Sequence, residues 1–445
     1  MTGQTNDLRA IADSRPLKHV VVIGANGTMG YGSGGLFTQA VPKVTFLART
    51  RAKAEEGVAA AVKQVRSSSL ASRTEVGDYD RDMEKALADA DLVFEALSED
   101  LTIKTPMFER IDALRRPDSI VATVTSGLSI NGLCADRSES FRRNFLGLHF
   151  FNPPNVIVGT ELVPGRETDP AVVEFVNAFA RLRLGREMVR THDTPAFAGN
   201  RVGFKVLNEV AQLAERIGVE NVERIIGPYT GRALTPLATI DLVGWDVHRA
   251  IVDNVYANTD DEVHDTLKLP DYMARLIAGG VLGDKSGRGF FAKEGGRRMV
   301  LDPATGDYRP AGDEDSRFDL SSVHGVARLF AQGRYRAGLH AFLDAPGEAA
   351  QIARKVMAGY IAYSFERVGE VAESINDIDR IMGAGFNWAP PSVLVDTMGP
   401  ARAAELVHGA GLAVPAVIES AARAAKPERF FVHPTMNPGR FFVAA

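Results

Sequence analysis

Short apolar runs alternate with charge-rich stretches through the first part of the chain. The run His-Val-Val-Val-Ile-Gly at 19–24 is rich in β-branched residues and ends at a glycine, which is typical of a buried parallel strand. Further strand candidates lie at 44–47, 91–95 and 119–124, with helical stretches at about 51–67 and 103–115. Strands that alternate with helices indicate βαβ units. The pattern predicts an α/β domain over residues 19–192, preceded by an extension at 1–18.

From about residue 199 the hydrophobic pattern has the helical period and strand signals nearly vanish. We predict a first helical domain at 193–294 and a second at 346–445. The segment 295–345 begins with a stretch rich in Gly, Arg, Asp and Pro, and we interpret it as a linker or surface excursion.

The helical part of the sequence contains an internal repeat. Glu-Arg-Ile-Ile-Gly at 223–227 returns as Asp-Arg-Ile-Met-Gly at 379–383, and Asp241-Leu-Val-Gly returns as Asp396-Thr-Met-Gly. The copies are 155 or 156 residues apart, and similar apolar stripes precede them at 202–217 and 357–375. Three features in the same order predict two related helical units.

Composition narrows the class of protein. The 445 residues suggest two to four domains, and the net charge of -5 with mixed signs argues against a nucleic-acid partner. The single cysteine, Cys134, allows no intrachain disulfide. No signal peptide is recognisable, and no run reaches the roughly 18 apolar residues of a membrane helix. We expect a cytoplasmic protein without membrane insertion.

A glycine turn follows the first predicted strand. Gly24, Gly27 and Gly30 stand directly before a predicted helix, where glycines let the backbone approach a pyrophosphate and the helix N-terminus offers free N–H groups. The usual spacing is Gly-x-Gly-x-x-Gly, and here Asn26 lengthens it by one residue. The strand before the turn favours a dinucleotide site.

The end of the second strand lacks the acid that usually holds the adenosine ribose of NAD. Ala48 and Arg49 stand there, followed by Arg51 and Lys53. Small and basic residues at this place can accept the 2′-phosphate of NADP, or can be solvated residues at the start of a helix. The choice between NAD and NADP therefore stays open.

His149 and Glu161 are candidates for acid–base chemistry. His149 lies in an apolar run that ends in a turn, and histidine suits proton transfer from a hydroxyl because its pKa lies near working pH. Glu161 follows twelve residues later. A carboxylate bonded to the far ring nitrogen would orient the imidazole and stabilise its charged form. Taken alone, either residue is more often structural.

An ordered set of motifs resembles the 3-hydroxyacyl-CoA dehydrogenase family. The set consists of the turn at 27–30, Phe94-Glu95-Ala96 with Glu99 and Lys104, Thr125-Ser126-Gly127, His149-Phe-Phe-Asn152-Pro, and Asp193-Thr194-Pro195 with Asn200-Arg201. Segments 241–246 and 282–290 resemble the C-terminal domain of that family, and 378–388 resembles the second C-terminal repeat of the long fatty-acid oxidation proteins. The resemblance covers about residues 18–430, with no enoyl-CoA hydratase domain.

The resemblance implies a Rossmann-type α/β domain followed by two all-α units like those of 6-phosphogluconate dehydrogenase. It implies that His149 is the general base, that Glu161 orients it, and that Ser126 and Asn200 hold the substrate oxygens. The cofactor contacts that it implies, together with the ribose position, are Gly24, Gly27, Met29, Gly30, Ala48, Arg49, Glu99, Lys104 and Asn152. No metal ligand is implied. The reaction would pass a hydride between a 3-hydroxyacyl-CoA thioester and NAD(P).

Three departures from the family pattern concern the cofactor: Asn26 in the turn, Ala48-Arg49 at the ribose position, and Val124 where asparagine is common. Two alternatives stay open, a dehydrogenase of a non-CoA hydroxy acid and a non-catalytic acyl-CoA-binding homologue. The repeats predict a pseudo-dimeric helical region, and hence a monomer or a homodimer.

Overall fold

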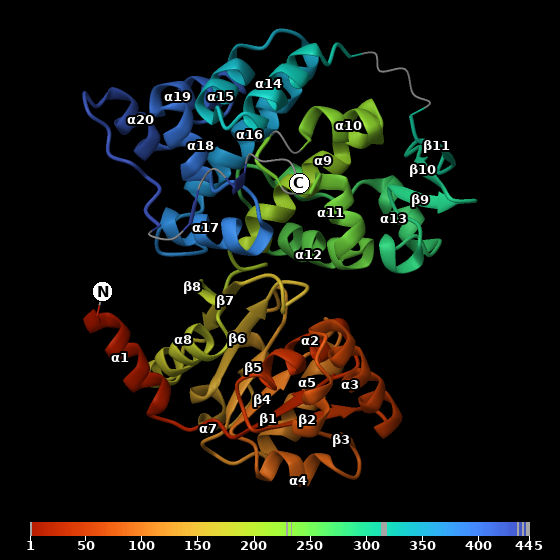
Figure 1. The fold of residues 1–445 in the computed structure, drawn as a ribbon, viewed down its shortest axis with the longest axis vertical. Coiled ribbons are helices and arrows are strands. Elements are labelled where there is room, and N and C mark those ends of the chain that lie inside the picture. The colour runs from red at the N-terminus through yellow and green to blue at the C-terminus, as the bar shows by residue number, and fades with distance from the viewer. Residues whose placement is uncertain are drawn as a thin grey trace. The chain divides into compact units, whose positions relative to one another are not determined.

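The computed structural model describes residues 2–227, 230–232, 234–312, 318–433, 436–437 and 440–441 of the chain, with side chains from residue 7 onward. The chain forms two compact units, residues 1–197 and 198–445 (Figure 1).

The first unit contains one large sheet with helices between its strands. Its strands are β1 His19–Ile23, β2 Lys43–Ala48, β3 Thr74–Asp78, β4 Leu92–Glu95, β5 Ile120–Thr123, β6 Phe145–Phe150, β7 Gly159–Pro164 and β8 Glu187–Arg190. Its helices are α1 Thr2–Asp13, α2 Thr28–Phe37, α3 Arg51–Val65, η1 Ser68–Arg73, α4 Met83–Ala88, α5 Leu101–Leu114, α6 Ile130–Cys134, α7 Glu139–Arg143 and α8 Pro170–Arg183.

The order of the eight strands is β3-β2-β1-β4-β5-β6-β7-β8. Neighbouring strands run parallel except β6 and β7, which pair antiparallel. The chain leaves β1 toward one edge and returns at β4 toward the other, so the topological switch point lies between β1 and β4. Ligands of open α/β sheets bind at such a point, beyond the carboxyl ends of the strands.

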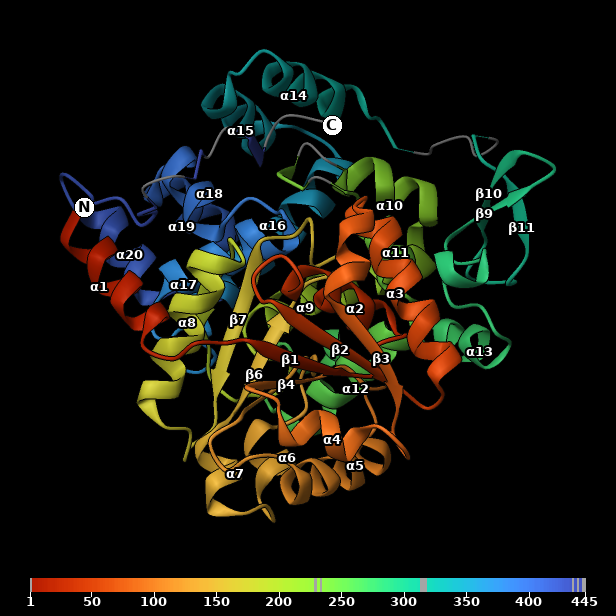
Figure 2. The same cartoon turned by 60° about the horizontal axis from the view of Figure 1, so that its bottom comes forward.

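Both faces of the sheet are buried, which explains the continuous apolar strands. Along β1, Val20 and Val22 face one core and Val21 and Ile23 face the other. Figure 2 shows α2, α3 and α8 on one face and α4 and α5 on the other. The alternation fixes the register of β1, because a slip by one residue would exchange the two faces.

The structure confirms the Rossmann-type α/β prediction and adds four strands that the sequence did not predict, β3, β6, β7 and β8. β3 has a polar sequence, Thr-Glu-Val-Gly-Asp, because it forms an edge of the sheet. The predicted N-terminal extension is largely the helix α1, which packs against α8. Asp13 of α1 also pairs with Arg183 of α8 at 2.5 Å.

The second unit is mainly helical. Its elements are α9 Gly199–Ile217, α10 Val219–Ile226, α11 Pro236–Val243, α12 Trp245–Asn258, η3 His264–Leu267, α13 Asp271–Ala278, η4 Asp284–Ser286, β9 Phe291–Glu294, β10 Arg297–Leu301, β11 Tyr308–Pro310, α14 Ser321–Ala331, α15 Tyr335–Asp344, α16 Glu348–Glu366, α17 Ile375–Ile381, η5 Met382–Phe386, α18 Pro391–Met398, α19 Pro400–Gly409 and α20 Ala416–Arg423. Across the described part of the chain, no helix is both long and apolar enough to cross a bilayer.

The segment 295–345, predicted as a linker or surface excursion, contains regular structure that the sequence did not predict. It includes β10, β11, α14 and α15, and β9, β10 and β11 form an antiparallel sheet. The glycines of this segment mark tight turns between short strands, because Gly295, Gly296 and Gly306 all have positive φ.

Equivalent acids of the predicted repeat make equivalent hydrogen bonds. Asp241 accepts the backbone N–H groups of Phe290 and Phe291, both at 2.9 Å. Asp396 accepts those of Phe430 and Phe431 at 3.1 and 3.0 Å. The likeness supports the prediction of a duplicated unit. The predicted helix at 357–375 is shorter at its C-terminus, since α16 ends at Glu366.

We predict that the buried Asp379 makes stability fall as pH rises. It is 1% exposed, and burial raises its pKa from 3.8 to about 8. A carboxyl group with a raised folded-state pKa contributes stability below its unfolded pKa, and the contribution is lost as pH rises toward 8. Asp379→Asn should reduce the loss of unfolding free energy between pH 5 and 8 by on the order of 3 kcal/mol, measured by urea denaturation.

The matched control is Asn376→Ala on the same helix, which changes no charge and should retain the wild-type pH dependence. Equal pH dependence in wild type and Asp379→Asn would contradict the prediction.

Candidate functional site

The glycine turn lies at the switch point of the sheet. Gly24 follows β1 with φ of +79°, and a Cβ there would lie 2.5 Å from the carbonyl oxygen of Ala96, which follows β4. The N–H groups of Gly24 and Ala25 both donate to Leu47 O at 3.1 Å, which ties the turn to β2. At Gly30 a Cβ would collide with the Gly24 carbonyl. The backbone of this turn therefore requires glycine at both positions.

The turn fits the pyrophosphate of a dinucleotide. Gly27 is the N-cap of α2 and provides no side-chain cap, so the first N–H groups of the helix keep their capacity to bind an anion. Met29 is partly buried against the core of the sheet, and its contact with the cofactor stays a prediction. Asn26, the extra residue, is exposed and leaves the strand–turn–helix geometry intact.

The adenosine side of the site has no free acid at the end of β2. Ala48 is fully buried, and Arg49 is exposed directly after it. At the end of β3, Asp78 accepts the N–H groups of Asp80 and Arg81 at 3.1 and 2.8 Å. These bonds fix the Asp78 carboxylate within its own turn, so it is poorly placed to replace the missing ribose acid.

A buried ion pair lies beneath the ends of β4 and β5. Glu95 and Lys104 are both fully buried, and the Lys104 ammonium donates to both Glu95 oxygens at 2.8 and 3.0 Å. Glu95 also accepts the Thr123 hydroxyl and the Leu97 N–H, each at 2.6 Å. Bonds of this kind satisfy two charges that would otherwise be costly to bury.

Glu99 connects this ion pair to the predicted substrate residue Ser126. It lies 3.6 Å from the Lys104 ammonium and accepts the Thr125 hydroxyl and the Ser126 N–H at 2.6 and 2.7 Å. Lys104 was predicted as a direct cofactor contact, but its ammonium is buried and bonded within the protein. The structure therefore favours a role in which Lys104 holds Glu95 and Glu99.

A second tether holds the Ser126 loop from the other side. Asp193 accepts the Ser129 hydroxyl at 3.0 Å and the backbone N–H groups of Ile130 and Asn131 at 2.7 and 2.9 Å. The loop between β5 and α6 is thus fixed by two carboxylates, Glu99 and Asp193, which come from distant parts of the sequence. It presents a half-buried Ser126.

His149 and Glu161 meet through the one antiparallel pairing of the sheet. They are opposite each other in the register of β6 and β7, and His149 Nδ1 lies 2.7 Å from Glu161 Oε2. The side chain of His149 is 5% exposed and that of Glu161 is fully buried. A carboxylate accepts only, so the bond places the proton of a neutral imidazole on Nδ1 and leaves Nε2 as the acceptor.

Two phenylalanines flank the imidazole. Phe151 and Phe197 lie with ring centroids 4.8 and 5.8 Å from that of His149. Ala196 and Phe197 both have positive φ, at 63° and 54°, a backbone conformation that is unfavourable for residues other than glycine. A Cβ at Gly127 would lie 2.7 Å from Ala196 Cα, so the Ser126 loop packs tightly on this strained segment.

The remaining predicted residues are less constrained by the structure. Asn152 is exposed in the loop after β6. Asn200 opens α9 in the second unit and is 4% exposed. Their contacts with cofactor and substrate stay predictions. Among the described residues, no cluster of three or more His, Cys, Asp or Glu side chains is arranged to hold a metal ion.

The sequence analysis missed two contributors to the site. Glu95 is the buried centre of the polar network, and its signal was an acid that ends the apolar run Leu-Val-Phe-Glu. Phe197 flanks His149 although 48 residues separate them, and no local signal could have revealed this.

We predict that Lys104→Met destabilises the first unit by about 3–5 kcal/mol, because it leaves the buried Glu95 carboxylate without a counter-charge. The matched variant Glu95→Gln/Lys104→Met removes both charges and should recover at least half of that loss. Urea denaturation followed by circular dichroism measures both values. If the single variant unfolded at the wild-type midpoint, the ion pair would not hold this part of the fold together.

Known proteins match most of the chain. Residues 19–194 match the family described as 3-hydroxyacyl-CoA dehydrogenase, NAD binding domain, and residues 197–293 match the one described as 3-hydroxyacyl-CoA dehydrogenase, C-terminal domain. A probable 3-hydroxyacyl-CoA dehydrogenase of Bacillus subtilis is 33% identical over 347 residues, which are 77% of this chain and 43% of the relative. The chain therefore spans less than half the length of that relative.

Shorter relatives match almost completely. A 3-hydroxybutyryl-CoA dehydrogenase of Mycobacterium tuberculosis is 30% identical over 289 residues, 62% of this chain and 99% of its own. A solved (S)-3-hydroxybutyryl-CoA dehydrogenase of Ralstonia eutropha is 27% identical, with a TM-score of 0.52 over 62% of this chain and 98% of its own. One from Escherichia coli, 23% identical, covers 92% of this chain and 98% of its own with a TM-score of 0.66, and shows the fold.

Proposed function

The chain belongs to the 3-hydroxyacyl-CoA dehydrogenase family, and we propose that it interconverts (S)-3-hydroxyacyl-CoA and 3-oxoacyl-CoA with NAD or NADP. The observation that carries the proposal is the buried pair of His149 and Glu161, joined at 2.7 Å. This pair lies in a domain whose switch point carries a turn that fits a dinucleotide. Acid–base chemistry and hydride transfer are the two halves of alcohol oxidation.

His149 and Glu161 have different roles in the oxidation. His149 Nε2 takes the proton of the 3-hydroxyl group, and Glu161 stabilises the imidazolium that results. A dinucleotide held at the glycine turn would supply the acceptor for the hydride of C3, and the C3–O bond would become a carbonyl. In the reverse direction His149 returns the proton. Phe151 and Phe197 limit the access of water to the ring and keep its orientation fixed.

Ser126 and Asn200 orient the substrate in this proposal, as the family resemblance implies. The loop that carries Ser126 is held by Glu99 and Asp193, so its backbone occupies a defined position. Fixed positions matter because orientation of the reacting carbon toward the nicotinamide supplies much of the rate.

One catalytic centre per chain is the expected number. At the repeat distance of 156 residues, Val356 stands where the first copy has Asn200, so the second copy lacks the amide. Equivalent glycines support a pseudo-dimeric packing of the two copies. Gly203 of α9 lies against the ring of Phe386. A Cβ added at Gly359 of α16 would lie 2.7 Å from Lys205 Nζ.

The first test is the reduction of acetoacetyl-CoA, followed at the nicotinamide absorbance. Wild type should turn over, and His149→Gln should lower kcat/KM by about 10²–10⁴-fold, because the proton-transferring group is lost. His408→Gln, at an exposed position of α19, is the matched control and should retain full activity. If His149→Gln turned over at the wild-type rate, the assignment of His149 as the base would be wrong.

We propose further that Arg49 lets the site accept the 2′-phosphate of NADP. The support is an exposed guanidinium at the end of β2, a buried Ala48 in place of a ribose-binding acid, and an Asp78 carboxylate already bonded in its turn. A carboxylate at the end of β2 would repel the phosphate, and Ala48 and Arg49 provide none there.

Arg49→Ala should weaken NADPH binding about tenfold and change NADH binding less than twofold, because one phosphate contact is worth roughly 1–2 kcal/mol. Fluorescence titration of the apoenzyme measures both dissociation constants without turnover. Arg81→Ala, an exposed arginine after β3, is the control. Equal losses for both dinucleotides would assign Arg49 to a general electrostatic role and overturn the proposal.

A further inference from the structure

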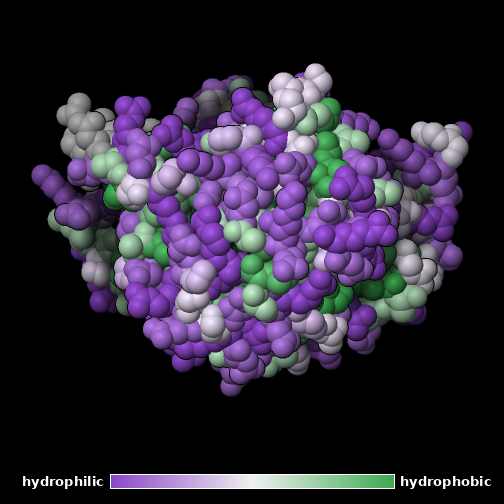
Figure 3. Space-filling model, turned by 90° about the horizontal axis from the view of Figure 1, so that it is seen from below, coloured by the Kyte–Doolittle hydropathy of each residue, from purple (hydrophilic) through white to green (hydrophobic). Residues whose placement is uncertain are grey.

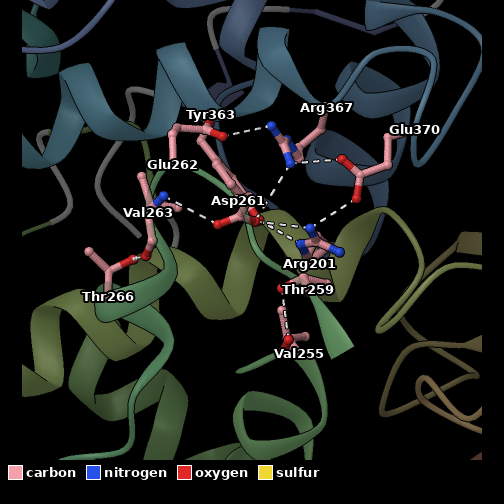
Figure 4. A network of polar contacts seen from close by, with 10 residues as sticks. All are labelled: Arg201, Val255, Thr259, Asp261, Glu262, Val263, Thr266, Tyr363, Arg367 and Glu370. Carbon is pink, nitrogen blue, oxygen red and sulfur yellow. Dashed lines mark hydrogen bonds and ion pairs between the residues drawn. The ribbon is translucent and has the colours of Figure 1, made fainter. Parts of the chain in front are cut away.

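A buried ionic network connects two parts of the second unit that are distant in sequence (Figure 4). Its centre is Arg201, which is 1% exposed and follows Asn200 in the first turn of α9. The guanidinium donates to Asp261 Oδ2 and to Glu370 Oε1, both at 2.9 Å, and its Nε donates to the Tyr363 hydroxyl at 2.6 Å. Arg201 therefore bonds three side chains, one from the segment after α12 and two from the end of α16 and the residues that follow it.

The partners of Arg201 are bonded to one another. The Tyr363 hydroxyl donates to Asp261 at 2.7 Å, and Arg367 donates to Glu370 at 2.7 Å and to Glu262 at 2.9 Å. Burial alone would raise the pKa of Asp261, but the bonds from Tyr363 and Arg201 hold it below its ordinary value. The cluster is thus an interlocked set of charges, in which each member limits the movement of the next.

The network fixes the rotation of α9 about its own axis. Consecutive helical residues point about 100° apart, so a guanidinium clamped from three sides determines where the preceding side chain points. A rotation of about 10° would move an amide group by about 1 Å, and misplacement by about 1 Å can cost a factor of about 10² in rate. Because Asn200 is 4% exposed, its side chain has little freedom to compensate.

We infer that Arg201 is a positioning residue for Asn200, and that Tyr363 and Glu370 hold Arg201 in place. The inference rests on the proposed function, in which Asn200 binds the substrate. Tyr363 lies on α16 and Glu370 follows it, beyond residues 197–293 that match the C-terminal family domain. The second helical segment thus contributes to turnover, although Val356 occupies the position equivalent to Asn200.

The test compares variants of the full-length chain in the acetoacetyl-CoA assay. Tyr363→Phe removes only the hydroxyl group and should lower kcat about tenfold. Arg201→Met should lower it about 100-fold, and Arg201→Lys should recover part of that loss. The dissociation constant of NADH, measured by fluorescence, should change less than twofold in all three, since the dinucleotide turn belongs to the first unit.

Arg354→Met is the matched control for general damage to the helical region. Arg354 lies on the same helix as Tyr363, and donates to the carbonyls of Phe342 and Ala345 at 3.1 and 2.7 Å, outside the network. It should lower the melting temperature to a similar degree while kcat stays at the wild-type value. All assays are run well below the lowest melting temperature.

A double-mutant comparison isolates the action through Asn200. In an Asn200→Ala background, Tyr363→Phe should have less than a twofold effect on kcat, because the group that it positions is gone. A full tenfold loss in that background, or wild-type kcat in Tyr363→Phe, would overturn the inference. Failure of the proposed function itself would look different, because the wild-type enzyme would then not reduce acetoacetyl-CoA.

Discussion

The antiparallel pairing of β6 with β7 is the interaction on which the candidate active site depends. All other neighbours in the sheet run parallel, so only here does the chain turn back directly on the preceding strand. The register then sets His149 against Glu161, and the imidazole and the carboxylate meet inside the sheet without water between them. A shift of either strand by one residue would turn its side chain to the other face and separate the pair.

Burial of both faces of the sheet explains where the other polar groups lie. Helices cover the strands along their length, so polar side chains that serve a ligand can gather only at the carboxyl ends. The acid Glu95 ends β4 and is buried, and the Lys104 ammonium balances its charge. Glu99 lies 3.6 Å from the Lys104 ammonium and accepts the Ser126 N–H. The position of the Ser126 loop therefore depends on the buried ion pair.

Buried ionic contacts also occur in the second unit. Its most buried ion pair, Arg201 with Asp261, connects helices in place of strand ends. Arg201 at the start of α9 bonds Asp261 after α12 and Tyr363 on α16, and Gly359 lets α16 approach Lys205 of α9 closely. The face drawn in Figure 3 is mainly hydrophilic, with small, scattered hydrophobic spots.

By itself, the sequence determined the fold class of the first domain, the turn at Gly24 and the choice of His149 as a candidate base, because hydrophobic period, glycine spacing and residue type are local properties. It also marked turns after β9, but it did not predict the short strands β10 and β11, since strands of three to five residues have little periodic signal. Only the tertiary structure decided that Lys104 is buried against Glu95 and that Phe197 flanks His149. Those contacts depend on which strands are neighbours, and strand order arises from packing over long distances in sequence.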